Sequence, residues 1–199
     1  KDASVSKTIN LGTSEINLYG SFPAFDTSIG TNTLDAGTSH IHFRGGITST
    51  TSNMYGILGA PGHVFYDVTY ENPTMTGVAI GNKGTATNPV HFHNVVLKGN
   101  GYIYGNNVFN ELTLLNSDYR FQANGTQVII SNLYASGNSC HPIELQSTTA
   151  GTQASLDVQG GKTAFNFDNV KDIKALSNTL YFGDKSTDDG NNMNLVFEK

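Results

Sequence analysis

The chain has 199 residues, a formal net charge of −5 at neutral pH, and 14% charged and 37% hydrophobic residues. An ordinary soluble domain has about 25% charged residues, so uncharged polar side chains supply most of the polarity here, while the length still allows a sizeable core. The low charge argues against a disordered chain, and the lack of a basic excess argues against nucleic acid as a partner.

Five segments of the chain repeat one short phrase. A large apolar residue is followed by a polar residue, an Asn or acidic residue, and apolar residues at or near the fourth and sixth positions. The copies are Phe65–Tyr70, Phe92–Leu97, Phe109–Leu114, Ile130–Ala135 and Phe167–Ile173. Their third residues are Asp67, Asn94, Glu111, Asn132 and Asn169, which are 27, 17, 21 and 37 residues apart. A spacing that varies around 20 residues is typical of a solenoid with loops of different lengths.

Each phrase alternates apolar and polar residues, which predicts a β-strand. The alternation breaks where Asn94 is followed by Val95 and Val96. We expect a corner there, since Asn tolerates the left-handed conformation of a tight turn. Strands bent in this way and stacked about 4.8 Å apart predict an all-β fold, a single-stranded right-handed parallel β-helix of about nine coils. The alternative is a two-sheet β-sandwich, in which strands recur every 8–12 residues or so.

Two rows of core residues follow from this register. The first residues of the phrases are expected to stack inside the coil: Phe65, Phe92, Phe109, Ile130 and Phe167. The fourth residues are expected to form a second inner row: Val68, Val95, Leu112, Leu133 and Val170.

These copies and four further segments cover most of the chain. The further segments are Thr8–Gly20 and Asn32–Gly46 as opening coils, Ser136–Leu156, and a closing segment that contains Asn191-Asn192-Met193. The pattern resembles the β-solenoid modules repeated in large secreted cell-surface proteins of the Bacteroidetes. In that family an aromatic residue usually follows the closing Gly-Asn-Asn, whereas Met193 stands here. The resemblance implies a secreted, cell-surface protein, and adhesin-like proteins are common among such modules.

We interpret residues 1–199 as a single β-solenoid domain, a fragment of a longer surface protein. The chain begins without the apolar segment of a signal peptide. It also has no apolar run near the roughly 20 residues that cross a bilayer, so we expect no membrane span in this segment. Neighbouring modules of the same chain are expected partners.

Two strands carry the pattern His-x-His, at His40–His42 and His91–His93. With Ile41 and Phe92 pointing inward, both histidines of each pair face outward, where two imidazoles can form half of a zinc or copper site. The pairs are 51 residues apart, two or three coils, so surface histidines without a metal are the favoured interpretation.

An acidic loop near the C-terminus contains Asp184, Asp188 and Asp189. Carboxylates suit calcium, but the spacing is not that of an EF-hand loop, and a solvated polar turn is favoured. We therefore expect no metal and no cofactor.

The alternative of a polysaccharide lyase or glycoside hydrolase requires convergent carboxylates, or a basic residue beside acidic ones, and the acidic residues are scattered along the chain. Asp67, Glu111 and Asp172 near the corners are expected to cap backbone N–H groups. Cys140, the only cysteine, is expected to fill a small buried space in the coil.

Thr-x-Thr pairs suggest a further alternative, an ice-binding solenoid, but they do not keep the spacing of the phrase. They lie at Thr31/Thr33, Thr48/Thr50, Thr74/Thr76 and Thr85/Thr87.

Tyr102 and Tyr104 share one side of a short strand, with Ile103 on the other side. Aromatic rings on an outer face stack on sugars, so these tyrosines are the candidate binding residues for a surface polysaccharide or glycan. With no catalytic residue identified, the sequence favours a non-catalytic binding module or a stiff spacer over an enzyme.

Overall fold

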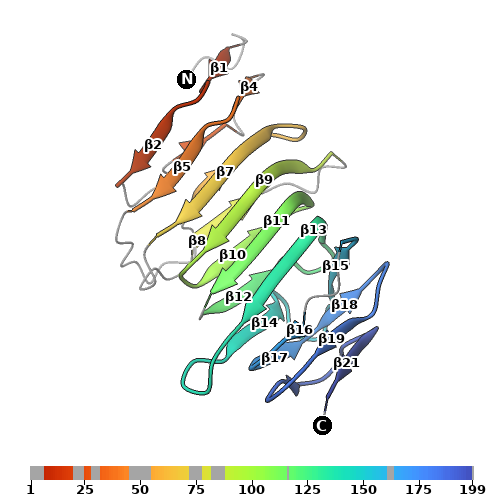
Figure 1. The fold of residues 1–199 in the computed structure, drawn as a ribbon. Coiled ribbons are helices and arrows are strands. Elements are labelled where there is room, and N and C mark those ends of the chain that lie inside the picture. Colours follow the sequence, from red (N-terminus) through yellow and green to blue (C-terminus); the bar gives the residue numbers. More distant parts are fainter. Residues whose placement is uncertain are drawn as a thin grey trace.

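The computed structural model describes residues 7–19, 25–27, 32–44, 55–71, 78–81, 88–115, 117–160 and 164–198. Every regular element in these ranges is a β-strand, and none of them contains a helix that could span a bilayer. Parallel strands form two long sheets that run from the N-terminal to the C-terminal end of the molecule (Figure 1). The all-β, parallel class expected from the phrases is thus confirmed.

The first sheet contains eight strands. In the order of the sheet they are β2 (Glu15–Leu18), β5 (His40–Phe43), β7 (Val64–Tyr70), β9 (Val90–Leu97), β11 (Asn107–Leu115), β13 (Thr126–Ser136), β15 (Ala154–Val158) and β18 (Ile173–Ala175).

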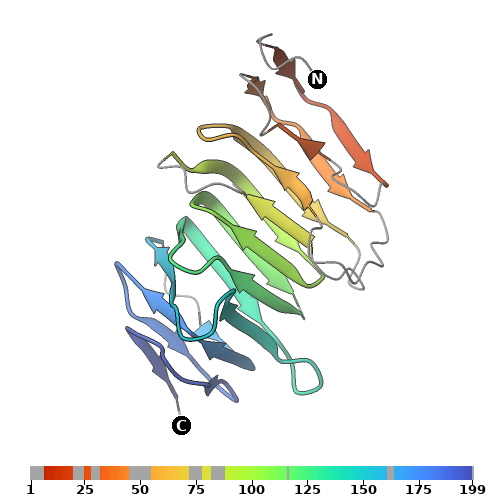
Figure 2. The same cartoon turned by 180° about the vertical axis from the view of Figure 1, so that it is seen from behind.

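The second sheet, which is seen best from behind (Figure 2), also contains eight strands. They are β3 (Phe25–Asp26), β6 (Tyr55–Leu58), β8 (Val78–Gly81), β10 (Gly101–Tyr104), β12 (Asp118–Phe121), β14 (Ile143–Ser147), β17 (Asp168–Lys171) and β20 (Thr187–Asp188).

Two smaller parallel sheets complete the described fold. One pairs β1 (Thr8–Asn10) with β4 (Thr33–Asp35), and the other joins β16 (Ala164–Phe165), β19 (Leu180–Phe182) and β21 (Leu195–Phe197). Through the middle of the chain, successive strands lie alternately in the first and the second sheet. Neighbouring parallel strands of one sheet are therefore connected through a strand of the other sheet, not by a hairpin. The described residues give eight strands to each long sheet, against the nine or so coils expected from length.

In the opening coils, stacked turns of the same sequence keep neighbouring strands in register. Each contains a Gly-Thr-Ser turn, and the amide of Thr38 donates to the carbonyl of Gly12 one coil away, at 2.8 Å. Gly12 and Gly37 both have positive φ, of 57° and 54°. A Cβ on Gly37 would lie 2.2 Å from the Gly12 oxygen, so only glycine fits this stacked turn.

The register of the phrase is confirmed in the middle of the first sheet. Asp67 pairs with Asn94, Asn94 with Glu111, and Glu111 with Asn132. The fifth copy was assigned wrongly, because Asn169 lies in the second sheet and pairs with Glu144.

An aromatic stack forms the inner row of this sheet, as expected for three of its members. Phe65, Phe92 and Phe109 are buried, with ring centroids 5.2 Å apart at each step. The expectation for Ile130 is wrong, since it is 49% exposed and Ile129 pairs with Phe109 instead. β13 holds one extra residue at this point, a β-bulge that turns Ile130 outward.

The expectation for Phe167 is also wrong. Phe167 has a φ of 58° and is only half-buried, because it occupies the turn before β17. The buried aromatic is Phe165, which stacks on Phe182 at 4.9 Å, and Phe182 stacks in turn on Phe197 at 5.0 Å.

The second inner row is confirmed for four of its five members. Val68, Val95, Leu112 and Leu133 are buried and follow one another in register. Val170 is buried as well, but it belongs to the second sheet and pairs with Leu145.

The corner in the phrase differs from the expected one. Asn94 does not have a positive φ, and β9 continues without interruption from Val90 to Leu97. His93 and Asn94 both lie on the outer side of β9, so Phe92 and Val95 can both face the core. The strand therefore turns two successive residues outward and continues as one strand, instead of ending at a left-handed residue.

Replacing Phe109 with Ala is expected to lower the free energy of unfolding by about 3–5 kcal/mol, because it removes the end of a fully buried stack. Ile130→Ala, on the neighbouring strand but outside the core, is the matched control and is expected to cost less than about 1 kcal/mol. Urea unfolding of both variants measures the difference. Equal losses would contradict the assignment of inner and outer positions.

A buried carboxyl group lies in β17. Asp168 is 0% exposed, and neither of its side-chain oxygens makes a hydrogen bond of good geometry, although the backbone N–H of Gly137 lies close enough to oppose part of the pKa shift. Burial raises the pKa of this carboxyl from 3.8 to about 8. The folded protein therefore holds a proton near neutral pH that the unfolded chain releases.

The free energy of unfolding is expected to fall as pH rises from about 4 to 8, because proton binding to Asp168 favours the folded state only below its folded pKa. The contribution is on the order of a few kcal/mol. Asp168→Asn, which cannot ionise, is expected to remove this part of the pH dependence. Urea titrations of both proteins at pH 4.5, 6 and 8 test it, and parallel pH profiles would show that Asp168 is already ionised in the folded protein.

Candidate functional site

The outer side of the first sheet carries two rows of side chains that follow from the register. The first row is His40, Asp67, Asn94, Glu111 and Asn132, and the second row is His42, Thr69, Val96, Thr113 and Tyr134. We call these two rows, which run across β5, β7, β9, β11 and β13, the outer polar strip. Its members are far apart in sequence and lie side by side only because the coils stack in register.

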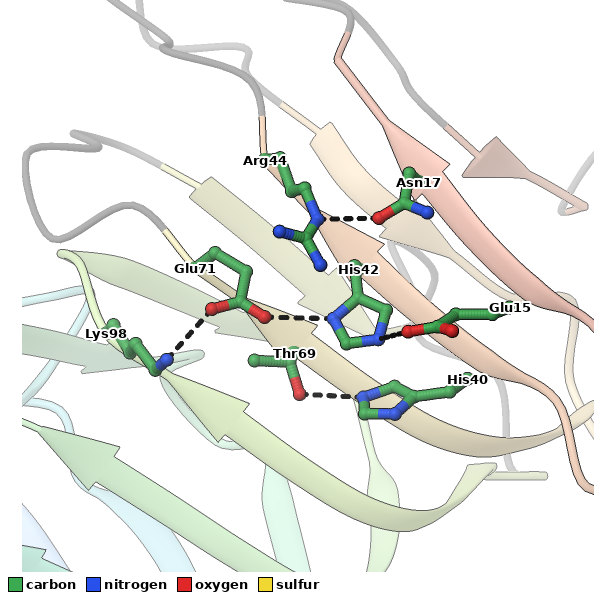
Figure 3. A network of polar contacts seen from close by, with 8 residues as sticks. All are labelled: Glu15, Asn17, His40, His42, Arg44, Thr69, Glu71 and Lys98. Carbon is green, nitrogen blue, oxygen red and sulfur yellow. Dashed lines mark hydrogen bonds and ion pairs between the residues drawn. The ribbon is translucent and has the colours of Figure 1, made fainter.

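A charged network stands at the N-terminal end of the outer polar strip (Figure 3). His42 Nδ1 lies 2.9 Å from Glu71 Oε1, and its Nε2 lies 2.9 Å from Glu15 Oε1. The Glu15 contact is an ion-pair distance without hydrogen-bond geometry, so Glu71 is the better partner. A carboxylate only accepts hydrogen bonds, so His42 donates from Nδ1 to Glu71.

Glu71 also receives a hydrogen bond from Lys98 Nζ, at 2.9 Å from Oε2. The Lys98 and His42 hydrogen bonds lower the pKa of Glu71 from 4.5 to about 2. Arg44 lies above this network and donates from Nε to Asn17 Oδ1 at 2.6 Å. Both cationic side chains at this end of the strip are therefore already held by neighbours.

His40 lies beside His42, with ring centroids 3.8 Å apart, and its Nε2 is 2.9 Å from Thr69 Oγ1. Burial and the neighbouring His42 lower the pKa of His40 below 6.5. His40 is therefore neutral at pH 7 and contributes a hydrogen-bonding group rather than a charge.

The next positions of the strip hold an Asp–His pair supported by an aromatic ring. His93 Nδ1 lies 2.9 Å from Asp67 Oδ1, and the His93 ring stacks on Tyr66 at 4.2 Å with an interplanar angle of 12°. Two coils on, Asn132 Nδ2 donates to Glu111 Oε1 at 2.8 Å. These contacts hold both carboxylates. Among the described residues neither accepts from a backbone N–H group as expected, whereas Asp172 does accept from the Gly151 amide at 3.1 Å.

A depression of about 260 Å³ lies within the strip. Its lining residues come from four neighbouring strands: His40, Asp67, Val68, Thr69, Asn94, Val95, Val96, Glu111 and Thr113. Carboxylate, amide and hydroxyl groups thus line the depression together with the apolar side chain of Val96, an arrangement that can bind a ligand with both C–H and O–H groups.

The His-x-His pairs have the expected orientation. Ile41 and Phe92 are buried, and His91 and His93 lie partly exposed on the outer side of β9. The two pairs are separated by β7. In the ranges that the structure describes, no three His, Cys, Asp or Glu side chains come together in a way that could hold a metal ion.

The acidic loop folds as a polar turn. Asp188 Oδ1 accepts from the Gly190 amide at 2.9 Å and from Asn192 Nδ2 at 2.6 Å. Asp184 and Asp189 are exposed, and their backbone groups join neighbouring coils. The carboxylate of Asp188 therefore stabilises its own turn.

Tyr102 and Tyr104 lie on the outer side of β10, with Ile103 buried behind them. Their rings are 5.9 Å apart and nearly parallel, at 11°, and the guanidinium of Arg120 lies 6.0 Å from the Tyr102 ring centroid. We call Tyr102, Tyr104 and Arg120 the tyrosine platform. It is on the second sheet and so separate from the outer polar strip.

Two further predictions concern Cys140 and the Thr-x-Thr pairs. Cys140 is exposed at a turn between Asn138 and His141, so the expectation that it fills a buried space is wrong. Seven of the eight threonines in the Thr-x-Thr pairs lie outside the described residues, and the eighth, Thr33, is exposed in β4.

The outer polar strip was not recognised from the sequence, although a signal for part of it was present. The third positions of the phrase, Asp67, Asn94 and Glu111, already indicated a row of polar groups on one outer side. The fifth positions of the same copies, Thr69, Val96, Thr113 and Tyr134, form most of the second row. Only the contributions of His40 and His42 depend on the register of the opening coils, which the phrase does not include. Comparison of the chain with protein-family models, curated proteins and solved structures found no match.

Glu71→Gln is expected to lower the free energy of unfolding by about 1 kcal/mol at pH 7, since it weakens the contacts to Lys98 and His42 at a partly exposed site. The Glu71 carboxylate stabilises the fold fully above its unfolded pKa of 4.5, and this is lost as pH falls toward 2. The two proteins should therefore converge in stability at low pH. Asp118→Asn, an exposed acid on β12, is the control, and a Glu71→Gln effect independent of pH would contradict the network.

Proposed function

We propose that this chain forms a right-handed, single-stranded β-helix and serves as a non-catalytic module of an exported cell-surface protein. In this role it acts as an adhesin-like binding module on a stiff rod. The fold part rests on the parallel ladders and on strands that alternate between two sheets. Crossovers between parallel strands are right-handed in about 98% of known cases, which favours the right-handed form.

The observation that carries the binding role is the tyrosine platform. Its two near-parallel rings stand half-exposed on the outer side of a rigid strand, and an Arg side chain flanks them. Rings fixed in this way lose little conformational freedom on binding, and they offer flat apolar faces to sugar rings. A surface polysaccharide or glycan is the corresponding ligand.

A stiff spacer is the simpler form of the same proposal. Stacked coils that contact only their neighbours make a rod whether or not a face binds anything. Neighbouring modules of the same polypeptide would then be its partners. The resemblance to surface modules and the low charge support the exported location for either form.

A polysaccharide-cleaving enzyme is the second candidate, and one observation favours it. Asp67 and Glu111 lie on one outer row with Asn94 between them, roughly 10 Å apart at the backbone. Inverting glycosidases place two carboxyl groups about 6.5–9.5 Å apart. Here, however, Asp67 accepts a hydrogen bond from His93, and Glu111 accepts one from Asn132. Both carboxyl groups are thus acceptors, whereas a general acid must present a proton to the leaving group. Binding is therefore the better-supported role.

The test combines a glycan array with a panel of polysaccharides assayed for new reducing or unsaturated ends. Tyr102→Ala/Tyr104→Ala is expected to weaken binding at least tenfold while changing the free energy of unfolding by about 1 kcal/mol or less, because both side chains lie outside the core. Tyr181→Phe, at an exposed tyrosine of β19 outside both long sheets, is the control. Turnover of any polysaccharide that disappears in Asp67→Asn or Glu111→Gln would replace the binding role with an enzymatic one.

A further inference from the structure

The depression in the outer polar strip combines features that the tyrosine platform lacks. Asp67, Asn94 and Glu111 line one side, and Thr69 and Thr113 line the other. Val96 stands between the two threonines in the second row. Polar acceptors in one row and hydroxyls beside an apolar side chain in the other match a pyranose ring, which has a C–H face and hydroxyl groups around its edge.

The charge of the depression restricts the ligand. Two of its lining residues are acidic, and none is Lys or Arg. The nearby cations are engaged elsewhere, Lys98 with Glu71 and Arg44 with Asn17. An anionic ligand would face two carboxylates without a compensating charge, whereas hydroxyl groups donate hydrogen bonds to carboxylates readily.

The polar groups of the depression are also fixed before any ligand arrives. His93, stacked on Tyr66, orients Asp67, and Asn132 orients Glu111. Tyr134 pairs with Thr113, so it occupies the second row one strand beyond the depression, and it is 45% exposed. Fixed acceptors and an adjacent aromatic side chain favour a ligand of more than one sugar unit that runs along the stack of coils.

We infer that the depression on β5, β7, β9 and β11 is a binding site for an uncharged oligosaccharide and rejects acidic polysaccharides such as polyuronates. This inference shares the glycan class with the proposed function but concerns a different sheet from the tyrosine platform. Substitutions therefore separate the two sites.

The experiment is isothermal titration calorimetry with the full chain and matched hexaoses. The uncharged probes are cellohexaose, xylohexaose, mannohexaose and laminarihexaose, and the anionic probe is hexagalacturonic acid. At least one uncharged hexaose is expected to bind at least tenfold more tightly than hexagalacturonic acid. Val96→Trp, which fills the depression from an outward position, is expected to weaken that binding at least tenfold.

A second variant tests the effect of the two carboxylate charges. Asp67→Asn/Glu111→Gln keeps the shapes of the side chains and removes both charges, so the preference for the uncharged probe over hexagalacturonic acid is expected to fall at least fivefold. Asp118→Asn, an exposed acid on the second sheet, is the matched control and should leave the preference unchanged. Circular dichroism and urea unfolding establish that each variant is folded.

The outcomes separate this inference from the proposed function. Binding that survives Val96→Trp but disappears in Tyr102→Ala/Tyr104→Ala would overturn the depression as a site and leave the proposed function supported. Tighter binding of hexagalacturonic acid than of every uncharged hexaose would overturn the ligand class. Failure of all four uncharged hexaoses to bind would overturn the inference as a whole, while glycan-array binding through the tyrosine platform would still test the proposed function.

Discussion

The in-register parallel ladder is the constraint on which the rest of this structure depends. Backbone hydrogen bonds place each residue beside its counterpart one coil away, so one choice of side chain affects a whole row. Inside, this produces the stack of Phe65, Phe92 and Phe109. A buried pair of amides shows the same effect, since Asn107 Nδ2 donates to Gln127 Oε1 at 2.7 Å and Gln127 Nε2 donates to the Gly105 carbonyl at 2.8 Å. Outside, it turns separate polar residues into the outer polar strip.

The sequence was informative wherever the length of a coil could be read from the phrase. The copies at Asp67, Asn94, Glu111 and Asn132 align as the spacing indicated, although the steps differ in length. Sequence reasoning failed where one residue was added or a turn intervened. Ile130 is displaced outward by the bulge in β13, and Phe167 by its left-handed turn. Neither event changes the alternation of residue types enough to be visible without the neighbouring strand.

The candidate site was less predictable than the core for a physical reason. Core positions are recognised by apolar side chains, which any stacked coil must bury, whereas the polar network joins residues from several coils at once. Glu15, His42, Glu71 and Lys98 come from four successive coils of the first sheet, and no local pattern relates them. Apart from the row of third positions in the phrase, only the orientation of single strands was accessible, as for Tyr102 and Tyr104 around Ile103.

The lengths of the strands have a consequence for how the molecule assembles and comes apart. β9, β11 and β13 have 8, 9 and 11 residues, whereas β2 at one end of the first sheet has 4 and β18 at the other has 3. In a one-dimensional stack, stability is a sum over adjacent coils, so the longest interfaces form the nucleus from which ordering spreads in both directions. Under tension applied at the two termini, the weaker outer coils would peel away first. The proposed rod would then lose its ends before its centre, which carries the outer polar strip.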